Sequence, residues 1–450
     1  MQEDTALDTL YPAHLTEVSG RWSAALATAG FDAAVVTAGE PKPYFLDDQS
    51  PPLKLNPHFL QWCPSETAAG SALLVTPGRA TCLYFLRPDD YWHKPPDVPV
   101  WAQAFEVKTF ADRETLLATI RSDALKAGNR VALVGDSGGD VLVDFPEEDR
   151  NPAPLLNPLH FARATKTPFE LACMRAATAK AARGHRAARE AFLAGASEFQ
   201  INLAYLGAAA QLPAELPYQN IVALNEHAGV LHYQHYDQSA PGRRLSFLID
   251  AGGSHLGYAA DVTRTYAAEP DSLFAELIDR LDVAQQAVVA ELADGVPFLD
   301  LHTGMHRRLA AILADTGLVT ATADAAFETG VTETFLPHGL GHLIGLQTHD
   351  VGGQQRAAEG GSKAPPANYP ALRLTRVIGE AMPVTIEPGL YFIPQLLDAL
   401  RASANAGMVD WERVTSLVPY GGIRIEDNVA LVKGRIENFT RDAFARLDGV

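Results

Sequence analysis

The sequence predicts a two-domain α+β protein, in which an α/β layer precedes a larger domain of long helices and short strands. The chain has 450 residues, which exceeds one ordinary core and suits two domains. Short β-branched runs alternate with helix-compatible stretches in the first third, as in an α/β layer. Prolines and charges then concentrate near residue 150. We therefore expect one domain over residues 1–155 and a second over residues 156–450.

The elements of the first domain follow from local patterns. A helix-compatible stretch covers residues 15–29, and the expected strands are the short apolar runs at residues 33–36, 73–75 and 130–134. Residues 146–154 hold three prolines and four charges. Because proline removes a backbone donor, this segment cannot continue a helix or a central strand, and it is expected to be a linker.

Helix ends can be read directly in the second domain. Thr167, Pro168 and Glu170 supply a capping hydroxyl, a first-turn proline and a carboxylate three residues after the cap. A helix is therefore expected from there to Gly195, and Ser197 starts a second capping box. Further helices are expected over residues 272–293 and 300–315, each followed by a glycine. The expected strands are residues 245–250, 261–266, 384–387 and 423–432, and the Gly-, Ala- and Pro-rich residues 351–370 are expected to form a mobile loop.

Composition excludes several classes of protein. The net charge of -18 disfavours attraction to nucleic acid or anionic lipid. No run approaches the roughly 18 apolar residues of a membrane span, and the start Met1–Asp4 lacks the basic residues of a signal peptide, so we expect a cytoplasmic protein. Cys63, Cys82 and Cys173 are scattered without CxxC spacing, which argues against a disulfide framework or a thiolate metal site.

Four acidic residues lie on apolar strand-like segments, where an unpaired charge is costly to desolvate. Asp250 ends one run, and Asp261 opens the next after a glycine-rich turn. Glu387 ends a third run, and Glu426 follows Arg424 by two residues on the same strand face. Each one alone could pair with a nearby basic residue or face water.

Convergence of all four carboxylates would need compensation. Each like-charge pair at about 4 Å would cost roughly 4 kcal/mol at an effective dielectric near 20. Two divalent cations would bring a formal charge of +4 against -4 from the four carboxylates. The pattern therefore predicts a binuclear metal site.

A nitrogen ligand is available in the segment 337–350. It contains His338, His342 and His349, and its glycines favour a tight loop over a continuous helix. A zinc motif of the HExxH type is excluded, because Gly339 occupies the glutamate position. Three histidines in one glycine-rich loop favour a functional site over three structural residues.

At these residues the chain resembles a known family. Asp250, Asp261, His342 in GHLIG, Glu387 in TIEPG and Glu426 in RIEDN occur in the order of the five metal ligands of the pita-bread metallopeptidases. HGLGHLIGLQTHDVGG from His338 and IEPGLYF from Ile386 resemble the bacterial prolidase branch, which includes the organophosphorus acid anhydrolases. Similar segments in the first domain, such as Tyr44–Asp48, extend the resemblance over nearly the whole chain.

The resemblance implies a creatinase-type α/β amino-terminal domain, a pita-bread catalytic domain and a homodimer. The implied activity is that of an Xaa-Pro dipeptidase acting on small dipeptides. Asp250 would chelate one metal ion, and Asp261 and Glu426 would bridge both ions. His342 and Glu387 would complete the coordination of the other ion. Oxygen-rich ligation suits Mn²⁺, with Co²⁺, Zn²⁺ or Fe²⁺ as alternatives. Such a metal pair lowers the pKa of water from about 15.7 towards about 7, and Glu387 would shuttle the proton to the departing nitrogen.

The family also implies roles around the metals. His232 and His349 would stabilise the tetrahedral intermediate and orient the substrate, while His338 and Arg424 would steady the ligands. Arg373, with Arg376 as a second candidate, would bind the free carboxylate of the substrate. The residues implied to line the substrate pocket are Tyr218, Leu231 and Thr348, with Thr348 in place of the expected valine, and Asp47 is a candidate for the neighbouring subunit's site.

Rival functions remain open at this point. Gly135–Gly139 (GDSGG) matches the active-site serine sequence of chymotrypsin-like proteases, but the α/β context and the missing histidine motif argue against that class. A metal-free binding module is disfavoured because all five ligand positions are filled. Organophosphate hydrolysis and an aminopeptidase P-like activity are alternatives on the same fold.

Overall fold

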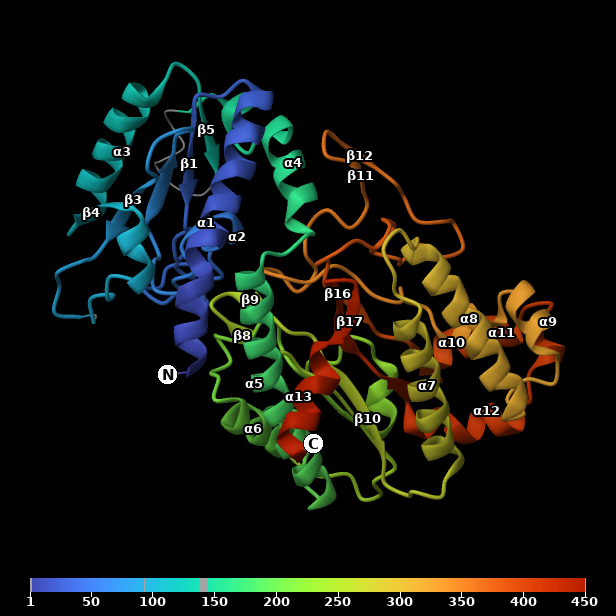
Figure 1. The fold of residues 1–450 in the computed structure, drawn as a ribbon. Helices are drawn as coiled ribbons and strands as arrows, with labels where there is room; N and C mark the ends of the chain where they lie inside the picture. The colour runs from blue at the N-terminus through green and yellow to red at the C-terminus, as the bar shows by residue number, and fades with distance from the viewer. Residues whose placement is uncertain (1, 93, 137–144, 450) are drawn as a thin grey trace. The chain divides into compact units, whose positions relative to one another are not determined.

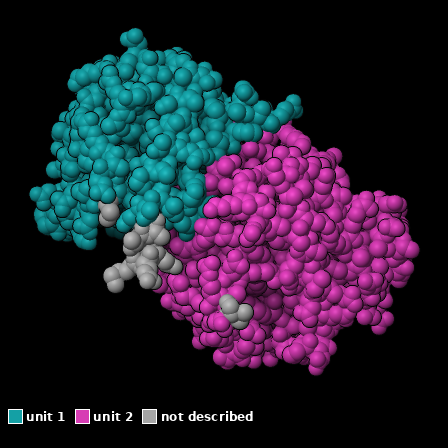
Figure 2. Space-filling model, in the orientation of Figure 1, with its two compact units in different colours: residues 1–163, 167–173, 356–361 teal, residues 164–166, 174–355, 362–450 magenta. Residues whose placement is uncertain are grey.

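The structure, a computed structural model, describes residues 2–92, 94–136 and 145–449. Contacts divide the chain into two compact units, which Figure 2 shows in different colours. Unit 1 comprises Met1–Arg163, Thr167–Cys173 and Arg356–Gly361, and unit 2 comprises Ala164–Lys166, Met174–Gln355 and Ser362–Val450. No helix among the described residues combines the length and apolarity that a bilayer crossing requires.

Unit 1 is built on a five-stranded mixed sheet in the order β4-β3-β2-β1-β5. The β1–β5 and β3–β4 pairs are parallel, and the β1–β2 and β2–β3 pairs are antiparallel. Helix α3 covers one face of the sheet and α1 lies on the other (Figure 1). The elements are α1 Gln2–Ala29, β1 Ala33–Thr37, α2 Pro57–Trp62, β2 Ala72–Val75, β3 Cys82–Leu86, β4 Glu106–Phe110, α3 Arg113–Ala127, β5 Val131–Val134 and α4 Ala153–Arg163.

The expected linker at residues 146–154 is more ordered than its prolines predict. Glu147–Asp149 form a short 3₁₀ helix, and Arg150 bridges to Leu133 beside β5. Helix α4 begins within the segment, at Ala153, and contains Pro158. Pro154 stands in the first turn of α4, where proline is tolerated because the backbone N–H there has no intrahelical partner.

Unit 2 contains two small sheets that carry the acidic residues. One has the order β10-β7-β6 and the other the order β13-β16-β17, and an isolated bridge joins Thr263 to Glu426 between them. The strands are β6 Ile221–Leu224, β7 Ser246–Asp250, β8 Ser254–His255, β9 Tyr258–Ala259, β10 Thr263–Ala267, β13 Val384–Ile386, β14 Gly389–Tyr391, β15 Gly422–Arg424, β16 Asp427–Val432 and β17 Arg435–Asn438.

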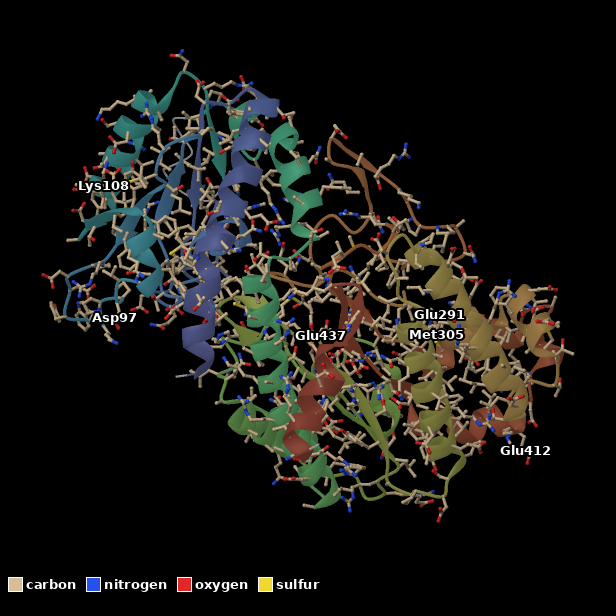
Figure 3. The ribbon with its side chains drawn as sticks, viewed as in Figure 1. Asp97, Lys108, Glu291, Met305, Glu412 and Glu437 are labelled. Carbon is tan, nitrogen blue, oxygen red and sulfur yellow. The ribbon has the colours of Figure 1, made fainter. Side chains whose placement is uncertain are left out.

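Long helices pack around these sheets. The predicted capping box at Ser197 is present. The Gln200 amide donates to the Ser197 hydroxyl, and the Ser197 amide donates to the side-chain oxygen of Gln200. A bidentate pair from Arg175 to Glu437 connects α5 to β17. Met305 of α8 lies in an apolar core that α7, α8 and β13 share; Glu437 and Met305 are labelled in Figure 3. The helices are α5 Pro168–Leu193, α6 Glu198–Ala209, α7 Leu273–Ala290, α8 Phe298–Asp315, α9 Ala323–Glu328, α10 Val331–Phe335, α11 Pro394–Arg401, α12 Trp411–Leu417 and α13 Phe439–Asp448.

Two further expected segments differ from the structure. The single strand expected over residues 423–432 is two strands, because the chain changes partner at Ile425 and Glu426: β15 pairs with β14, and β16 pairs with β13. The loop expected at residues 351–370 contains the two-stranded pair β11 Gln355–Ala357 and β12 Gly360–Ser362. Three-residue strands around paired glycines give too short an alternation to be seen in sequence.

Candidate metal centre

The first two carboxylates lie at one end of the β10-β7-β6 sheet. Asp250 is the last residue of β7, and its register partner on β10 is Thr263, two residues after Asp261. The intervening chain folds as the small β8–β9 hairpin, whose turn residues Leu256 and Gly257 both have positive φ. The predicted convergence of these two acids is confirmed by a shared partner, since the Tyr218 hydroxyl lies 2.7 Å from Asp250 Oδ1 and 2.5 Å from Asp261 Oδ1.

The other predicted ligands, His342, Glu387 and Glu426, lie close to Asp261 or to one another. His342 Nε2 lies 3.5 Å from Asp261 Oδ2 and 3.5 Å from Glu387 Oε1. Asp261, His342 and Glu426 present ligand atoms that all lie within 4.8 Å of one another, and all three residues are buried. The structure therefore brings together side chains that stand 176 residues apart at their extremes, from 250 to 426.

Backbone hydrogen bonds hold the histidine loop against the second sheet. The loop pairs with β13, because the Thr385 amide donates to the His342 carbonyl and the Glu387 amide donates to the Leu340 carbonyl. Gly341 permits this approach, since a Cβ there would lie 1.9 Å from the Thr385 carbonyl oxygen. The glycine-rich segment is a loop rather than a helix, as predicted, and it aims His342 at the carboxylates.

The cluster has too few cations for its acids. Burial raises the pKa of Glu387 to about 7, raises that of Glu426 well above its usual value, and raises that of Asp250. Burial would raise the pKa of Asp261 too, but the hydrogen bonds from His342 and Tyr218 and the charges of His342 and His349 together outweigh it, and the pKa falls. Burial alone would lower the pKa of His342, but its contact with Asp261 and the charge of Glu387 together raise it. An oxygen-rich donor set with one imidazole and a surplus of negative charge fits divalent cations.

Arg424, which the family resemblance assigns to steadying the metal ligands, begins a chain of hydrogen bonds at the predicted ligand Asp250. Its Nη2 donates to Asp250 Oδ2 at 2.7 Å, and its Nη1 donates to the Tyr391 hydroxyl at 2.8 Å. That hydroxyl lies 2.8 Å from His338 Nε2, while His338 Nδ1 lies 2.8 Å from the Gly339 carbonyl. The carbonyl can only accept, so the proton of His338 stands on Nδ1 and Tyr391 donates to Nε2.

Tyr391 and Thr263 belong to the site but were not singled out from sequence. Tyr391 connects Arg424 to His338, and the Thr263 hydroxyl donates to Glu426 Oε2 at 2.7 Å. Tyr391 falls inside the IEPGLYF segment, so its place beside Glu387 was the one signal available. Tyr218, expected to line a pocket, contacts two of the ligands directly.

The three histidines that were expected to act beside the metal ligands lie around this cluster. The ring of His349, whose surface is partly exposed, meets that of His342 edge-on with centroids 4.4 Å apart, and partial desolvation and the charge of His342 lower the pKa of His349 to about 4. His232 is exposed, and its charge bears on the pKa of both His338 and His349. Burial lowers the pKa of His338 to about 3.

The candidate substrate residues divide by their contacts. Arg373 is exposed, and its charge contributes to lowering the pKa of His349. Arg376 is half-buried and donates to the Gly352 carbonyl at 3.4 Å. The Thr348 hydroxyl is buried without a hydrogen-bond partner in the described part of the chain, and Leu231 is half-buried. Asp47 lies in unit 1, exposed, and accepts from the Gln49 amide at 3.1 Å.

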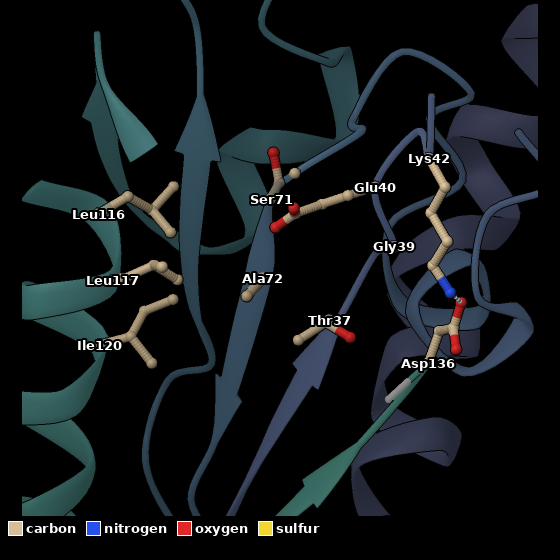
Figure 4. A pocket seen from close by; sticks show the side chains of 11 residues that line it. Thr37, Gly39, Glu40, Lys42, Ser71, Ala72, Leu116, Leu117, Ile120 and Asp136 are labelled. Carbon is tan, nitrogen blue, oxygen red and sulfur yellow. Dashed lines mark hydrogen bonds and ion pairs between the residues drawn. The ribbon is translucent and has the colours of Figure 1, made fainter. Parts of the chain in front are cut away.

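The rival serine motif lies only partly within the structure. Ser137, Gly138 and Gly139 are outside the described residues. Asp136 forms an ion pair with Lys42 at 2.7 Å, at the edge of a small pocket in unit 1 (Figure 4). The Lys42–Asp136 contact is exposed and polar, and the side chains that line this pocket include no histidine.

Comparisons with known proteins agree along the whole chain. Residues 172–433 match the model of metallopeptidase family M24, and residues 9–161 match that of the N-terminal domain of Xaa-Pro dipeptidase. A protein named Xaa-Pro dipeptidase from Xanthomonas axonopodis pv. citri is 45% identical over 98% of this chain and 99% of its own length. One of the same name from Stenotrophomonas maltophilia (strain K279a) is 45% identical over 98% of each.

Solved structures show the fold. The zinc-substituted aminopeptidase P of Escherichia coli, in complex with product, has a TM-score of 0.71 at 21% identity, covering 95% of each chain. Proline aminopeptidase P II from Yersinia pestis has a TM-score of 0.70 at 20% identity, covering 97% of this chain and 100% of its own. The predicted creatinase-type amino-terminal domain and pita-bread domain are thereby confirmed. The chain belongs to metallopeptidase family M24 and carries an amino-terminal domain of the Xaa-Pro dipeptidase type.

Proposed function

We propose that the protein is an Xaa-Pro dipeptidase, which hydrolyses the peptide bond before a carboxy-terminal proline in dipeptides. The observation that carries the proposal is the cluster of four carboxylates and one histidine at the end of the β10-β7-β6 sheet, in which the acids outnumber the cations Arg424 and His342. Support for the substrate class comes from the relatives named Xaa-Pro dipeptidase, which are 45% identical over 98% of this chain.

Five residues of this chain would hold two divalent cations, with Mn²⁺ the best match to the oxygen-rich donors and Co²⁺, Zn²⁺ or Fe²⁺ as alternatives. Asp250 would bind one ion and Asp261 and Glu426 both. His342 and Glu387 would complete the coordination of the other ion. The ions, when bound, supply Lewis acidity that activates water at neutral pH.

The surrounding side chains have distinct tasks. Glu387 Oε would take a proton from the attacking water and hand it to the departing nitrogen, a task for a carboxylate within reach of both atoms. This transfer is essential, because the amide before proline has no N–H and its nitrogen must leave as a secondary amine. His338, neutral with its proton on Nδ1, and Arg424 would keep Asp250 in place. His232 and His349 would orient the substrate carbonyl.

Arg373 is the better candidate for the free carboxylate of the substrate. It is exposed and its charge bears on the pKa of His349, whereas Arg376 is engaged with the Gly352 carbonyl. A guanidinium suits this task because it binds a carboxylate in two-point fashion. Thr348, whose buried hydroxyl has no partner within the described residues, would offer a hydrogen bond to the substrate, and Tyr218 and Leu231 would contact the substrate beside it.

We also propose that the active form is a homodimer. Unit 1 exposes large apolar side chains in two loops: Phe45 is 92% exposed and Trp92 is 75% exposed. Residues that adjoin these loops, Glu40 and Asp90 among them, line one pocket of unit 1. Clustered exposed aromatic residues mark interaction sites more often than free surface. Asp47, in the first of these loops, would then approach the partner subunit's site.

A panel of peptides tests the proposed activity. The protein loaded with Mn²⁺ is expected to cleave Ala-Pro and Leu-Pro but not Ala-Pro-Ala, and a chelator should abolish cleavage whereas a serine-directed inhibitor should not. Cleavage of the tripeptide with dipeptides spared would establish an aminopeptidase P-like enzyme instead. A higher kcat/KM for a fluorophosphonate than for Leu-Pro would establish an organophosphorus acid anhydrolase.

A further inference from the structure

The segment that carries Leu231 and His232 has little secondary structure of its own. Between β6 and β7 the chain forms one short 3₁₀ helix, Asn225–Gly229, and then runs irregularly to residue 245. His232 is exposed, yet it is close enough to influence the pKa of His338 and His349. Something outside the segment must therefore fix where His232 lies.

Glu198 contacts this segment at its beginning, middle and end. It is the first residue of α6, and its side chain is 1% exposed. Its Oε1 accepts from the Leu224 amide at 2.9 Å and from His227 Nδ1 at 2.8 Å. Its Oε2 accepts from the Tyr233 hydroxyl at 2.9 Å and from the Asp237 amide at 2.9 Å. One carboxylate thus gathers 14 positions of chain, from 224 to 237.

Glu198 and its neighbours His227 and Asp237 are residue types that bind metals, but the carboxylate of Glu198 has no acceptor position left for a cation. Glu198, His227 and Asp237 present ligand atoms within 4.8 Å of one another. A carboxylate offers about four lone-pair sites, and the four donors around Glu198 occupy them all. The cluster is therefore satisfied without a cation, unlike the centre at Asp261.

The donors around Glu198 also support one another. The rings of His227 and Tyr233 stack with centroids 4.6 Å apart and an interplanar angle of 22°. Tyr233 directly follows His232 and is buried, so the bond from its hydroxyl to Glu198 fixes the backbone from which His232 projects. Removing the charge of Glu198 would weaken all four contacts at once, because hydrogen bonds to an ionised acceptor are the stronger kind.

We propose that Glu198 is a positioning residue, which aims His232 and Leu231 at the metal centre by anchoring the segment 224–237. The proposal rests on the dipeptidase function proposed above, since it assigns Glu198 a part in that reaction. Glu198 itself touches neither metal ligand nor substrate. Its effect on catalysis passes through His232.

The test uses the full-length protein with both metals loaded and the substitutions E198Q, H232A and the double variant. Glutamine keeps the size of the side chain but replaces one acceptor oxygen by a donor. We expect E198Q to lower kcat/KM for Leu-Pro by about 10- to 100-fold, mainly through kcat, as small displacements of a catalytic group do. We expect the double variant to match H232A alone, because two residues that act through one step are not additive.

E226Q is the matched control, since Glu226 is an exposed acid of the same segment with no hydrogen bond through its side chain among the described residues. It should retain wild-type kcat/KM. If E198Q does not fold, Y233F removes a single donor and should show a smaller loss with the same non-additivity. Multiplicative losses in the double variant, or an E198Q enzyme as active as E226Q, would overturn the proposal.

Two readouts are independent of activity. Hydrogen exchange of the Asp237 amide should accelerate in E198Q and remain slow in E226Q, and equal protection in both would overturn the anchoring role. Elemental analysis should find the same metal content in E198Q as in the wild type, and loss of one equivalent would show that the cluster is a metal site after all. If the wild type does not cleave Leu-Pro while exchange responds as expected, the dipeptidase proposal fails and the anchor stands.

Discussion

Replacing Lys166 by methionine should destabilise unit 2 strongly, because it removes the ammonium that faces a buried carboxylate. Lys166 Nζ lies 2.8 Å from Asp350 Oδ2, and each side chain is 1% exposed. Two unit charges at that distance interact by about 6 kcal/mol at an effective dielectric near 20. Desolvation cancels much of this gain, and breaking such a pair from one side costs about 3–5 kcal/mol.

The ion pair also supports the histidine loop. Gly345 lies directly on it, since a Cβ there would be 2.5 Å from Asp350 Oδ2 and 2.7 Å from Lys166 Nζ. The Asp350 amide donates to the Leu343 carbonyl, which closes the loop that holds His349 against His342. The charge pair therefore contributes to the geometry of the centre as well as to stability.

Thermal unfolding of the metal-free protein measures the effect. K166M should lower the midpoint by about 10 °C, at roughly 2–4 °C per kcal/mol for a unit of this size. The double variant K166M/D350L should recover most of the loss, because a packed apolar pair of similar volume is close to neutral. R280M, which breaks the exposed pairs of Arg280 with Glu276 and Asp315, is the control and should move the midpoint by no more than about 3 °C. A K166M midpoint equal to that of R280M, or a double variant no more stable than K166M, would refute the reasoning.

Three further changes have defined outcomes. E387Q should lower kcat by about 10²- to 10⁴-fold while elemental analysis shows unchanged metal; a fall that merely follows lost metal would argue against the proton transfer. R373M should raise KM for Leu-Pro by about 10- to 100-fold but leave KM for Leu-Pro amide unchanged, and equal effects on both would remove Arg373 from carboxylate binding. His302 is buried, which lowers its pKa to about 3, compared with about 6.5 in the unfolded chain. As the pH falls below about 6.5, the unfolded chain therefore binds a proton that the folded chain does not. The free energy of unfolding accordingly decreases between pH 6.5 and pH 3. H302L should flatten the fall of the metal-free melting midpoint between pH 6.5 and 5, where the histidine contributes about 2 kcal/mol; an unchanged slope would contradict the shifted pKa.

Local signals in the sequence predicted the helices of unit 2 well. The capping box at Ser197 and the proline at the start of α5 both appear where they were expected, because capping depends on a few neighbouring residues. The loop character of residues 337–350 followed in the same way from its glycines. The hairpin spacing suggested that Asp250 and Asp261 converge, electrostatics showed that four converging acids would need cations, and the family pattern joined the acids and His342 in one site.

Features that depend on distant partners could not be predicted. The break between β15 and β16 arises because the Ile425 amide donates to the Pro388 carbonyl and the next amide donates to the Thr263 carbonyl. Nothing in residues 423–432 encodes that change of partner. Tyr391 was missed for the same reason, since its role depends on Arg424 and His338, each more than 30 positions away. The anchoring of segment 224–237 by Glu198 likewise joins two elements whose sequences give no sign of each other.

A crystal structure grown with excess Mn²⁺ will show whether these five side chains hold two divalent cations. Anomalous scattering at the manganese edge should show two peaks per chain, one of them touching Asp250, both touching Asp261 and Glu426, and the other touching His342 and Glu387. Absence of anomalous density at this cluster, or a single ion that leaves His342 and Glu387 without a metal, would contradict the account.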